Sequence, residues 1–372
     1  MLVVRAITTA DLDALLDMAG QVGTGMTTLK ADRRMLGERV AVAVASFAQT
    51  IAPEERDYMF VMEDTASGRL AGVCAIKGAV GLTEPFYNYR IGTLVHSSRE
   101  LDIFTRMDTL YLSNDLTGAT ELCSLFLHPD YRVGHNGKWL SKSRFLFIAQ
   151  FPHLFTEKLI AEMRGFQADD GSSPFYEGLG RHFFQMDFDH VDDLSALGKK
   201  SFIAELMPRQ PLYVAYLPED AQAVIGKVHH NTLPARKLLD QEGMHFEGSI
   251  DIFDAGPVLQ ARVSELRAMR DSVLVTAELG TPAQDAELAQ QLAAEAATNV
   301  ATDAATSAAK QAAADATLIS NTVLHDFRII VAPAAPAAGS LVLSPAQLEL
   351  LHCQRGDPLR ALPLNVKKNL HG

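Results

Sequence analysis

Cysteine is scarce in this sequence, and nothing in it suggests export or membrane insertion. Cys74, Cys123 and Cys353 are the three cysteines in 372 residues, and they show no metal-ligand spacing. An odd and sparse count argues against a disulfide framework and fits a reducing compartment. The first residues turn acidic too soon for a signal peptide, and no apolar run is long enough to span a bilayer. We therefore expect a cytoplasmic protein without a metal site.

Positive charge is also in short supply. Asp and Glu outnumber Lys and Arg by 45 to 33, which gives a net charge of −12. A phosphate backbone would repel such a chain, so we expect no nucleic-acid partner. The 48% of apolar and 21% of charged residues are the balance of a globular protein, and the length allows two or three domains.

Strand-like and helix-like patterns alternate through most of the chain and predict an α/β fold. Two apolar runs joined by a turn at Ser67 and Gly68 predict a hairpin over residues 59–76. Thr8 offers N-cap chemistry for a helix that carries Leu12, Leu15 and Met18. Further strands are expected at residues 2–6, 88–95, 108–113, 159–165 and 248–256, and further helices at about 30–49 and 219–243.

The composition changes abruptly at Thr281. From there to about Thr317, alanine occupies nearly every second position, and large apolar residues are almost absent. Alanine favours helix, but such a stretch has little with which to pack, so we expect a linker or a frayed helix without a chemical role. Strand patterns resume at 318–332, and the ordered pieces beside the tract could belong together, with the tract as a looped insertion.

The most informative stretch is ELCSLFLHPDYRVGHNGKWLSKSRFLFIA, residues 121–149. An apolar strand ends at His128, a basic loop with Arg132, Gly134, Gly137 and Lys138 follows, and a helical run begins near Leu140. Backbone amides at a glycine-rich turn that leads into a helix create a site for an anion. The loop contains neither GxxxxGK[ST] nor GxGxxG, so spacing alone leaves open a plain strand–turn–helix.

The flanks of this loop resemble the fourth strand and pyrophosphate loop of the GNAT superfamily of acyl-CoA-dependent N-acyltransferases. The family pattern is R/Q-x-x-G-x-G/A. Arg132 and Gly137 match its first and last positions, whereas His135 occupies the middle glycine position and Gly134 comes one residue early. The resemblance implies a mixed sheet in which the strand diverges from its neighbour. The strand backbone then pairs with the pantetheine arm, and the loop holds the pyrophosphate of coenzyme A.

Longer blocks resemble the bacterial arginine N-succinyltransferases. They include YNYRIGTLVHSS (87–98), LSKSRFLFIAQF, SPFYEGLGRHFFQMDF and IDIFDAGP, and the match covers roughly residues 1–275 and 318–364. This family transfers succinyl from succinyl-CoA to the α-amino group of L-arginine, in the first step of an arginine catabolic route. Succinyl-CoA is then a co-substrate, and no permanently bound cofactor is expected.

The resemblance also suggests how the chain is divided. We expect a GNAT-like acyl-CoA-binding domain at 1–190 and a second, partial α/β unit at 191–275. The alanine-rich linker occupies 281–317, and a small β-rich module at 318–372 packs on the core. We expect a homo-oligomer, or a hetero-oligomer with a paralogous subunit.

Acyl transfer to an amine requires proton transfer, for which histidine is suited near neutral pH. His229 and His230 stand in KVHHNTLPARKLLDQEG, and an arbitrary pair of this kind is usually only solvated. The resemblance implies that His229 is the catalytic proton donor. It also implies an acyl-CoA contact at Leu125, whose main chain can pair with pantetheine amides. Leu127, two residues on, has the same facing.

The residues that bind the substrate charges stay open at this point. A cation is needed for the succinyl carboxylate, and a carboxylate for the substrate guanidinium. Cys123 could suggest an acyl-cysteine intermediate, although a cysteine in a strand is more often a small buried hydrophobe. The candidate cations are Arg90, Lys142, Arg144 and Arg164, and the candidate carboxylates are Glu121, Glu162 and Asp187.

Two other functions remain compatible with the sequence. The chain could be a paralogous subunit that prefers ornithine or another amino acid. It could also be a catalytically silent subunit that binds acyl-CoA and serves a partner.

Overall fold

The computed structural model describes residues 1–22, 26–196, 201–280 and 316–366. Within them, 15 strands form one continuous sheet in the order β14-β11-β15-β12-β13-β1-β2-β3-β6-β7-β10-β9-β4-β5-β8. Most neighbouring strands are antiparallel, and the parallel pairs are β6 with β7 and β11 with β14. The mixed α/β fold expected from the sequence is confirmed. No helix in the described ranges has the length and apolarity needed to cross a membrane.

The strands follow the sequence patterns closely in the first half of the chain. The predicted hairpin is β2 and β3, and the strand before the glycine loop is β6. The strands are β1 (Leu2–Ala6), β2 (Asp57–Asp64), β3 (Arg69–Lys77), β4 (Asn88–Ser98), β5 (Ile103–Ser113), β6 (Thr120–Leu127), β7 (Lys158–Glu162), β8 (Leu212–Tyr213), β9 (His245–Asp251), β10 (Pro257–Arg262), β11 (Val273–Leu279), β12 (Thr317–Ser320), β13 (Arg328–Ala332), β14 (Ser340–Leu343) and β15 (Pro358–Pro363).

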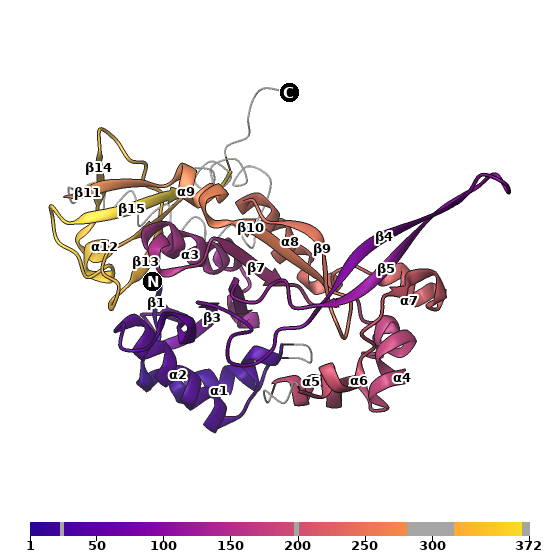
Figure 1. Cartoon of the computed structure of the whole chain (residues 1–372). Helices are drawn as coiled ribbons and strands as arrows, with labels where there is room; N and C mark the ends of the chain where they lie inside the picture. Colours follow the sequence, from indigo (N-terminus) through magenta and orange to yellow (C-terminus); the bar gives the residue numbers. More distant parts are fainter. Residues whose placement is uncertain (23–25, 197–200, 281–315, 367–372) are drawn as a thin grey trace, which may run out of the picture.

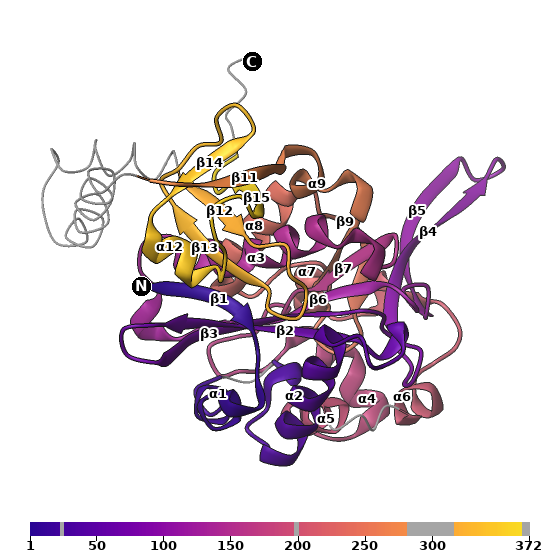
Figure 2. The same ribbon diagram turned by 90° about the vertical axis from the view of Figure 1, so that its left-hand side faces the viewer.

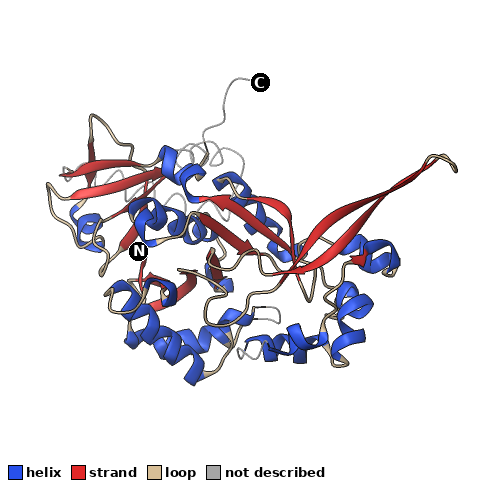
Figure 3. Cartoon of the chain, viewed as in Figure 1, coloured by secondary structure: helices blue, strands red, loops and turns tan. Residues whose placement is uncertain are grey.

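Helices cover both faces of the sheet (Figures 1 and 3). The helices α1, α2 and α5 lie along one face, and α3, α8 and α9 lie along the other. The helices are α1 (Leu12–Ala19), α2 (Arg33–Phe47), α3 (Asn136–Gln150), α4 (Arg181–Phe184), α5 (Phe188–Ala196), α6 (Ser201–Leu206), α7 (Glu219–Val224), α8 (Leu233–Glu242), α9 (Arg267–Asp271) and α12 (Pro345–Leu350). We call the two faces the α2 face and the α3 face.

The helix expected over residues 219–243 is wrong as a single element. It is interrupted between α7 and α8, and residues 225–232 form a loop with a short 3-10 turn at His230–Thr232. Gly226, at φ +70°, takes a left-handed conformation that ends the first helix. Pro234 stands in the first turn of α8, where proline is tolerated because its missing N–H has no helical partner. The break places His229 in the loop.

The strands β4 and β5 are longer than predicted and form an arm. They pair with each other over their full lengths, from Asn88 with Ser113 to Ser98 with Ile103. Within the described chain, β4 also pairs with β9 at residues 88–90, and β5 with β8 at Thr109 and Leu110. The rest of the ribbon projects from the body of the molecule (Figure 1).

The alanine-rich tract lies mostly outside the described residues, which resume at Ala316. The predicted linker nevertheless extends too far, because Ala316 is buried and Thr317 begins β12. The segments that flank the tract do belong together. The strand β15 pairs with β11 on one side and with β12 on the other, and β13 pairs with β1. The C-terminal strands thus continue the main sheet (Figure 2).

The helix α3 is buried on nearly every side. All residues from Trp139 to Ala149 are buried, including Lys142, which contacts Glu242 of α8. The Lys142 Nζ atom lies 2.5 Å from Glu242 Oε1, and Arg267 Nε of α9 donates to the same oxygen at 2.9 Å. The side chains of Lys142 and Glu242 are both 0% exposed. One carboxylate therefore joins three helices that are distant in sequence.

We predict that Glu242→Gln lowers the free energy of unfolding by about 3–5 kcal/mol, because two buried cations lose their shared anion. Urea denaturation followed by circular dichroism measures this change. Glu177→Gln is the matched control, since Glu177 forms an exposed i,i+4 pair with Arg181 and should change stability little. Equal effects of the two substitutions would contradict a structural role for the buried cluster.

Candidate active site

The strands β6 and β7 begin as neighbours and then separate. They pair in parallel at Thr120 with Leu159 and at Glu121 with Ile160. Beyond Glu121, the described part of β6 pairs with β3 alone. The divergence that the resemblance implied for this strand is therefore present. In the described chain, it leaves residues 122–127 without a strand partner on the β7 side.

A β-bulge lies in β6 just beyond the point of divergence. Val73 of β3 pairs with Phe126, and Ala75 pairs with Cys123, so Ser124 and Leu125 together oppose Cys74. Ser124 has φ +53°, which is an unfavourable conformation for a residue other than glycine. Such strain persists only where the surroundings hold it, and it concentrates at functional sites.

Two arginines approach the bulge from opposite faces of the sheet. On the α2 face, Arg39 Nη1 donates to Ser124 Oγ at 2.7 Å, and Arg39 Nε contacts Asp57 Oδ2 at 2.7 Å. On the α3 face, Arg144 Nη1 lies 3.5 Å from the carbonyl oxygen of Cys123. These contacts stabilise the bulge, including the unfavourable backbone conformation of Ser124.

Leu125 and Leu127 have the same facing, as predicted. Both pack against the apolar cluster on the α3 face, together with Leu122, whereas Cys123 and Phe126 pack on the α2 face. The bulge explains why Leu122 and Leu125 share a face although they are three residues apart. The side chains of Leu125 and Leu127 thus serve the core, while their main chain lies along the divergence. Their contact with acyl-CoA stays a prediction.

The glycine loop is shorter than the sequence suggested. The helix α3 begins at Asn136, so Gly137 and Lys138 belong to its first turn and not to the loop. A Cβ atom at Gly137 would lie at an ordinary 3.7 Å from Leu127, so packing does not require glycine there. Gly134 does adopt a left-handed conformation, at φ +55° in open space. The N-terminal amides of α3 receive no side-chain cap from His135.

The charged side chains Arg132 and Lys138 already form hydrogen bonds within the protein. Arg132 Nε donates to the carbonyl oxygen of Leu127 at 3.0 Å, and its guanidinium lies over the Phe126 ring. Lys138 donates to Asn365 of the C-terminal segment. Burial and the neighbouring cations Lys142 and Arg267 lower the pKa of Lys138 to about 8. Positive charge therefore gathers at the start of α3, where an anion would be stabilised.

His229 lies beside the carboxyl end of β7. Its backbone N–H donates to the backbone carbonyl oxygen of Arg164 at 2.9 Å, and the preceding Val228 forms a β-bridge with Gly165. Val228 packs with Met163 in the cluster on the α3 face. Since side chains alternate along an extended segment, His229 and Arg164 face the other way, toward the α2 face.

One nitrogen of the His229 ring is already occupied. The N–H of Asn231 donates to Nδ1 at 3.2 Å, so Nδ1 carries no proton in this arrangement and Nε2 carries the hydrogen of the neutral ring. Burial, Arg164 and His230 lower the pKa of His229 below its usual value. The imidazole is therefore neutral near pH 7 and presents Nε2–H to its surroundings.

The α2 face of β6 and β7 carries most of the remaining polar candidates. Glu121 and Cys123 of β6 share this face with Glu162 of β7 and with Arg164 just beyond it, because these residues alternate with core residues of the α3 face. Glu162 accepts a hydrogen bond from Asn88 at 2.9 Å. Burial lowers the pKa of Arg164, and Asp254, Asp192 and Asp189 act in the opposite direction.

Other candidates are used elsewhere. Lys142 belongs to the buried cluster with Glu242, and Asp187 is an exposed partner of Arg181. Arg90 is exposed on β4. Cys123 is buried, and burial raises the pKa of its thiol to about 11, which disfavours the thiolate that an acyl-cysteine route needs.

Sequence patterns do not reveal the residues that shape the site without reacting. Arg39, Asp57 and Ser124 hold the bulge, and Asp254 binds backbone amides next to Arg164. Arg39 could have been noticed, because it is a charge directly beside the buried helix position Val40. The residue types of ELCSLFL do not predict that Ser124 takes a left-handed backbone conformation.

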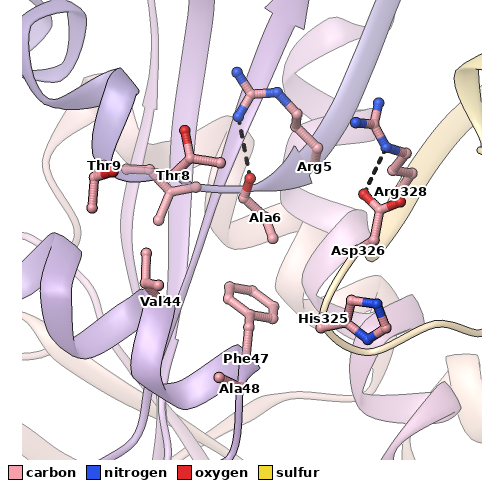
Figure 4. Close-up of a pocket in the computed structure, with 11 residues that line it drawn as sticks. Arg5, Ala6, Thr8, Thr9, Val44, Phe47, Ala48, His325, Asp326 and Arg328 are labelled. Atoms are coloured by element: carbon pink, nitrogen blue, oxygen red, sulfur yellow. Dashed lines mark hydrogen bonds and ion pairs between the residues drawn. The ribbon is translucent and has the colours of Figure 1, made fainter.

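A cavity of about 290 Å³ lies away from the divergence (Figure 4). It is bounded by the end of β1, the end of α2 and the segment before β13, with Phe47 and Val44 on one side and His325 on another. Arg5 donates to Ala6, and Arg328 to Asp326, so its cations already have acceptors. None of the predicted site residues lines it.

Comparisons with known proteins agree with this geometry. Residues 2–268 match the family described as "Arginine N-succinyltransferase beta subunit", and residues 300–363 match its C-terminal domain. The chain is 47% identical over 367 residues to an arginine N-succinyltransferase subunit beta of Pseudomonas aeruginosa, covering 99% of each. It is 43% identical over 364 residues to an arginine N-succinyltransferase of Shigella sonnei, covering 98% of each.

A solved structure resembles the whole chain. It is an arginine/ornithine succinyltransferase subunit AI from Pseudomonas aeruginosa, which superposes with a TM-score of 0.83 at 32% identity over 98% of this chain and 99% of that one. The resemblance inferred from the sequence blocks is confirmed. With both the sequence and the fold matched along almost their full lengths, the chain belongs to the arginine N-succinyltransferase family, whose members are acyltransferases.

Proposed function

We propose that this chain transfers succinyl from succinyl-CoA to the α-amino group of L-arginine, by direct attack of the amine and with His229 as the acid/base. Membership in the family supports the reaction. The observation that carries the mechanism is the position of His229 beside the end of β7, next to the divergence of β6 and β7. Succinyl-CoA is a co-substrate and not a permanently bound cofactor.

The acyl-CoA lies along the free side of β6 in this proposal. Main-chain groups near Leu125 and Leu127 pair with the pantetheine amides as a neighbouring strand would. The pyrophosphate lies at Arg132, Gly134 and Gly137, against the uncapped amides of α3. Lys138 adds positive charge to the same end of the helix. The bound acyl-CoA would then extend from the loop, between the separated strands β6 and β7, to the α2 face.

The reaction moves one proton from the amine nitrogen to the sulfur of coenzyme A. The amine attacks the thioester carbon, the new C–N bond forms and the C–S bond breaks. Nε2 of His229 gives its proton to the departing sulfur in the same step in which the amine nitrogen gives a proton back to Nε2, so that the ring stays neutral and the sulfur leaves as a thiol. Nε2 is the nitrogen that exchanges, because Asn231 occupies Nδ1.

His229→Ala should lower kcat on the order of a hundredfold or more, the usual loss for a positioned acid/base. His229 should contribute an acidic limb below about pH 6.5 to the wild-type kcat/KM profile, because the lowered pKa of His229 means that its protonation requires a more acidic solution. Thioester consumption measured against pH gives both results.

His230→Ala is the control for this test. It should keep the rate, and its acidic limb should move slightly toward higher pH, because His230 helps to lower the pKa of His229. A His229→Ala enzyme with unchanged kcat would exclude the mechanism. A wild type that binds acyl-CoA but transfers no succinyl would instead favour the alternative of a silent subunit.

Arg164 is the best-placed candidate for the succinyl carboxylate, because it is adjacent to His229. We predict that the wild type prefers succinyl-CoA to acetyl-CoA and that Arg164→Ala reduces this preference about tenfold or more, as expected for the loss of a charge-assisted hydrogen bond. The exposed Arg90→Ala should leave the preference unchanged. The same assay with arginine and ornithine tests the acceptor, and a rate no higher with arginine would favour the ornithine alternative.

We propose further that the chain assembles with another succinyltransferase chain, either a second copy or a paralogous subunit. The family and a 47% identical relative are both described as a beta subunit, which supports an assembly. The arm supports it too, because an isolated two-stranded ribbon is marginally stable in water. Leu101 and Phe104 near its tip are 70% and 72% exposed. The expected cytoplasmic location and the domain boundaries other than the end of the linker stay predictions.

Phe104→Asp should lower the molar mass of the purified protein in solution, measured by size-exclusion chromatography with light scattering. Leu274→Asp is the control, since Leu274 is 58% exposed on β11, toward the other end of the strand order. A mass that is unchanged by Phe104→Asp would remove the arm from the interface. A monomeric wild type would leave the paralogous subunit as the partner.

A further inference from the structure

Asp254 is a buried carboxyl group at the turn between β9 and β10. It is 7% exposed, and both of its oxygens bind backbone amides. Oδ2 accepts the N–H of Gly165 at 2.6 Å, and Oδ1 accepts the N–H of Gly256 at 2.8 Å. One side chain thus joins the segment after β7 to the start of β10, across a gap in the sequence of about 90 residues.

The two glycines that it binds have no room for a side chain. A Cβ atom at Gly165 would lie 2.3 Å from the carbonyl oxygen of Asp254, and one at Gly256 would lie 2.0 Å from the carbonyl oxygen of Met163. Real Cβ atoms do not approach other heavy atoms so closely. The backbones at Met163–Gly165 and Asp254–Gly256 are therefore in direct contact, with the carboxyl group of Asp254 between them.

The loop that carries His229 is attached to the same two segments. The N–H of Gly226 donates to the carbonyl oxygen of Ala255 at 2.9 Å, and the N–H of His229 donates to that of Arg164 at 2.9 Å. Val228 pairs with Gly165 between these two bonds. Both anchors of residues 226–229 are therefore next to a group that Asp254 binds directly.

We propose that Asp254 is a positioning residue for His229, which acts by clamping the two backbone segments that hold the histidine loop. The proposal rests on the proposed role of His229. Asp254 touches neither the ring nor a reacting atom. It sets the distance between Arg164–Gly165 and Ala255–Gly256, and this distance sets where the imidazole stands relative to the end of β7.

The chemistry of the clamp requires a carboxyl group. Two N–H donors converge on two different oxygens, and asparagine supplies only one acceptor oxygen, so Asp254→Asn must lose one bond and aim an amide N–H₂ at a donor. Burial and the nearby Asp251 raise the pKa of Asp254 well above its usual range. The fold thus keeps an ionisable group where ionisation is costly, as expected when its two oxygens are needed.

A double-mutant cycle tests the proposal. Asp254→Asn should lower kcat about tenfold with succinyl-CoA and with acetyl-CoA alike, because Asp254 acts through His229, which serves both reactions, and not only through Arg164. In the His229→Ala background, the same substitution should lower kcat less than about twofold, because residues that act through one group are not additive.

Two further variants make the test decisive. Asp11→Asn is the matched control, because Asp11 is also 7% exposed and binds the backbone N–H of Thr8. It should lower Tm without changing kcat. If Asp254→Asn does not yield folded protein, Asp254→Glu replaces it in the cycle, since it keeps both oxygens and displaces them by one methylene group.

The outcomes separate the two proposals. If His229→Ala keeps the wild-type kcat, the proposed function fails. If His229→Ala loses activity but Asp254→Asn does not, the positioning role fails. An equal loss from Asp254→Asn in the wild-type and His229→Ala backgrounds also overturns it, because Asp254 would then act independently of the histidine.

Discussion

The loss of pairing between β6 and β7 after Glu121 is the constraint on which the rest of the site depends. An inner strand of a sheet normally forms backbone hydrogen bonds with a neighbour on each side. Over residues 122–127, β6 has no strand partner on the β7 side among the described residues and stays paired with β3 on the other. The bulge at Ser124 accompanies this change, because a bulge bends a strand and increases its twist. Arg39 and Arg144 brace the bent strand from the two faces. On the far side of the gap, β7 continues into Arg164, to which the histidine loop is bonded. The proposed acyl-CoA route and the proposed acid/base thus both lie where the sheet departs from regular geometry.

The elements with strong local signals could be predicted from the sequence. The strand Leu2–Ala6, the hairpin β2–β3 and the strand–loop–helix at β6 and α3 have periodic apolar residues and clear turn residues. The break at residues 225–232 could not be seen as well, because Gly226 is a single glycine in a helical pattern and such residues are often tolerated within helices. The predicted linker extends one residue into β12, because Thr317 differs little in type from the residues before it. Its place in β12 depends on pairing with β13 and β15, which the local sequence does not show.

The site itself was only partly accessible to sequence reasoning. His229, Leu125 and the loop residues came from family resemblance, and composition alone would not have selected them. The roles of Lys142 and Asp187 could not be judged, because whether a charge is buried in a cluster or exposed in a surface pair depends on tertiary contacts. The same limit applies to Asp254, whose partners are Gly256, which is near in sequence, and Gly165, which is not. The role of Asp254 depends on its long-range contact with Gly165, and no local sequence pattern predicts that contact.

The shared carboxylate of Glu242 has a consequence for how the molecule can be divided. Its two cationic partners come from α3 and α9, and Arg267 also donates to the carbonyl oxygen of Pro363 near the C-terminal end of β15. Any fragment that ends between these helices would leave an ion in an apolar interior without its counter-ion. The helices α3, α8 and α9 and the last strand β15 should therefore melt as one cooperative unit, whatever borders the sequence suggests between them.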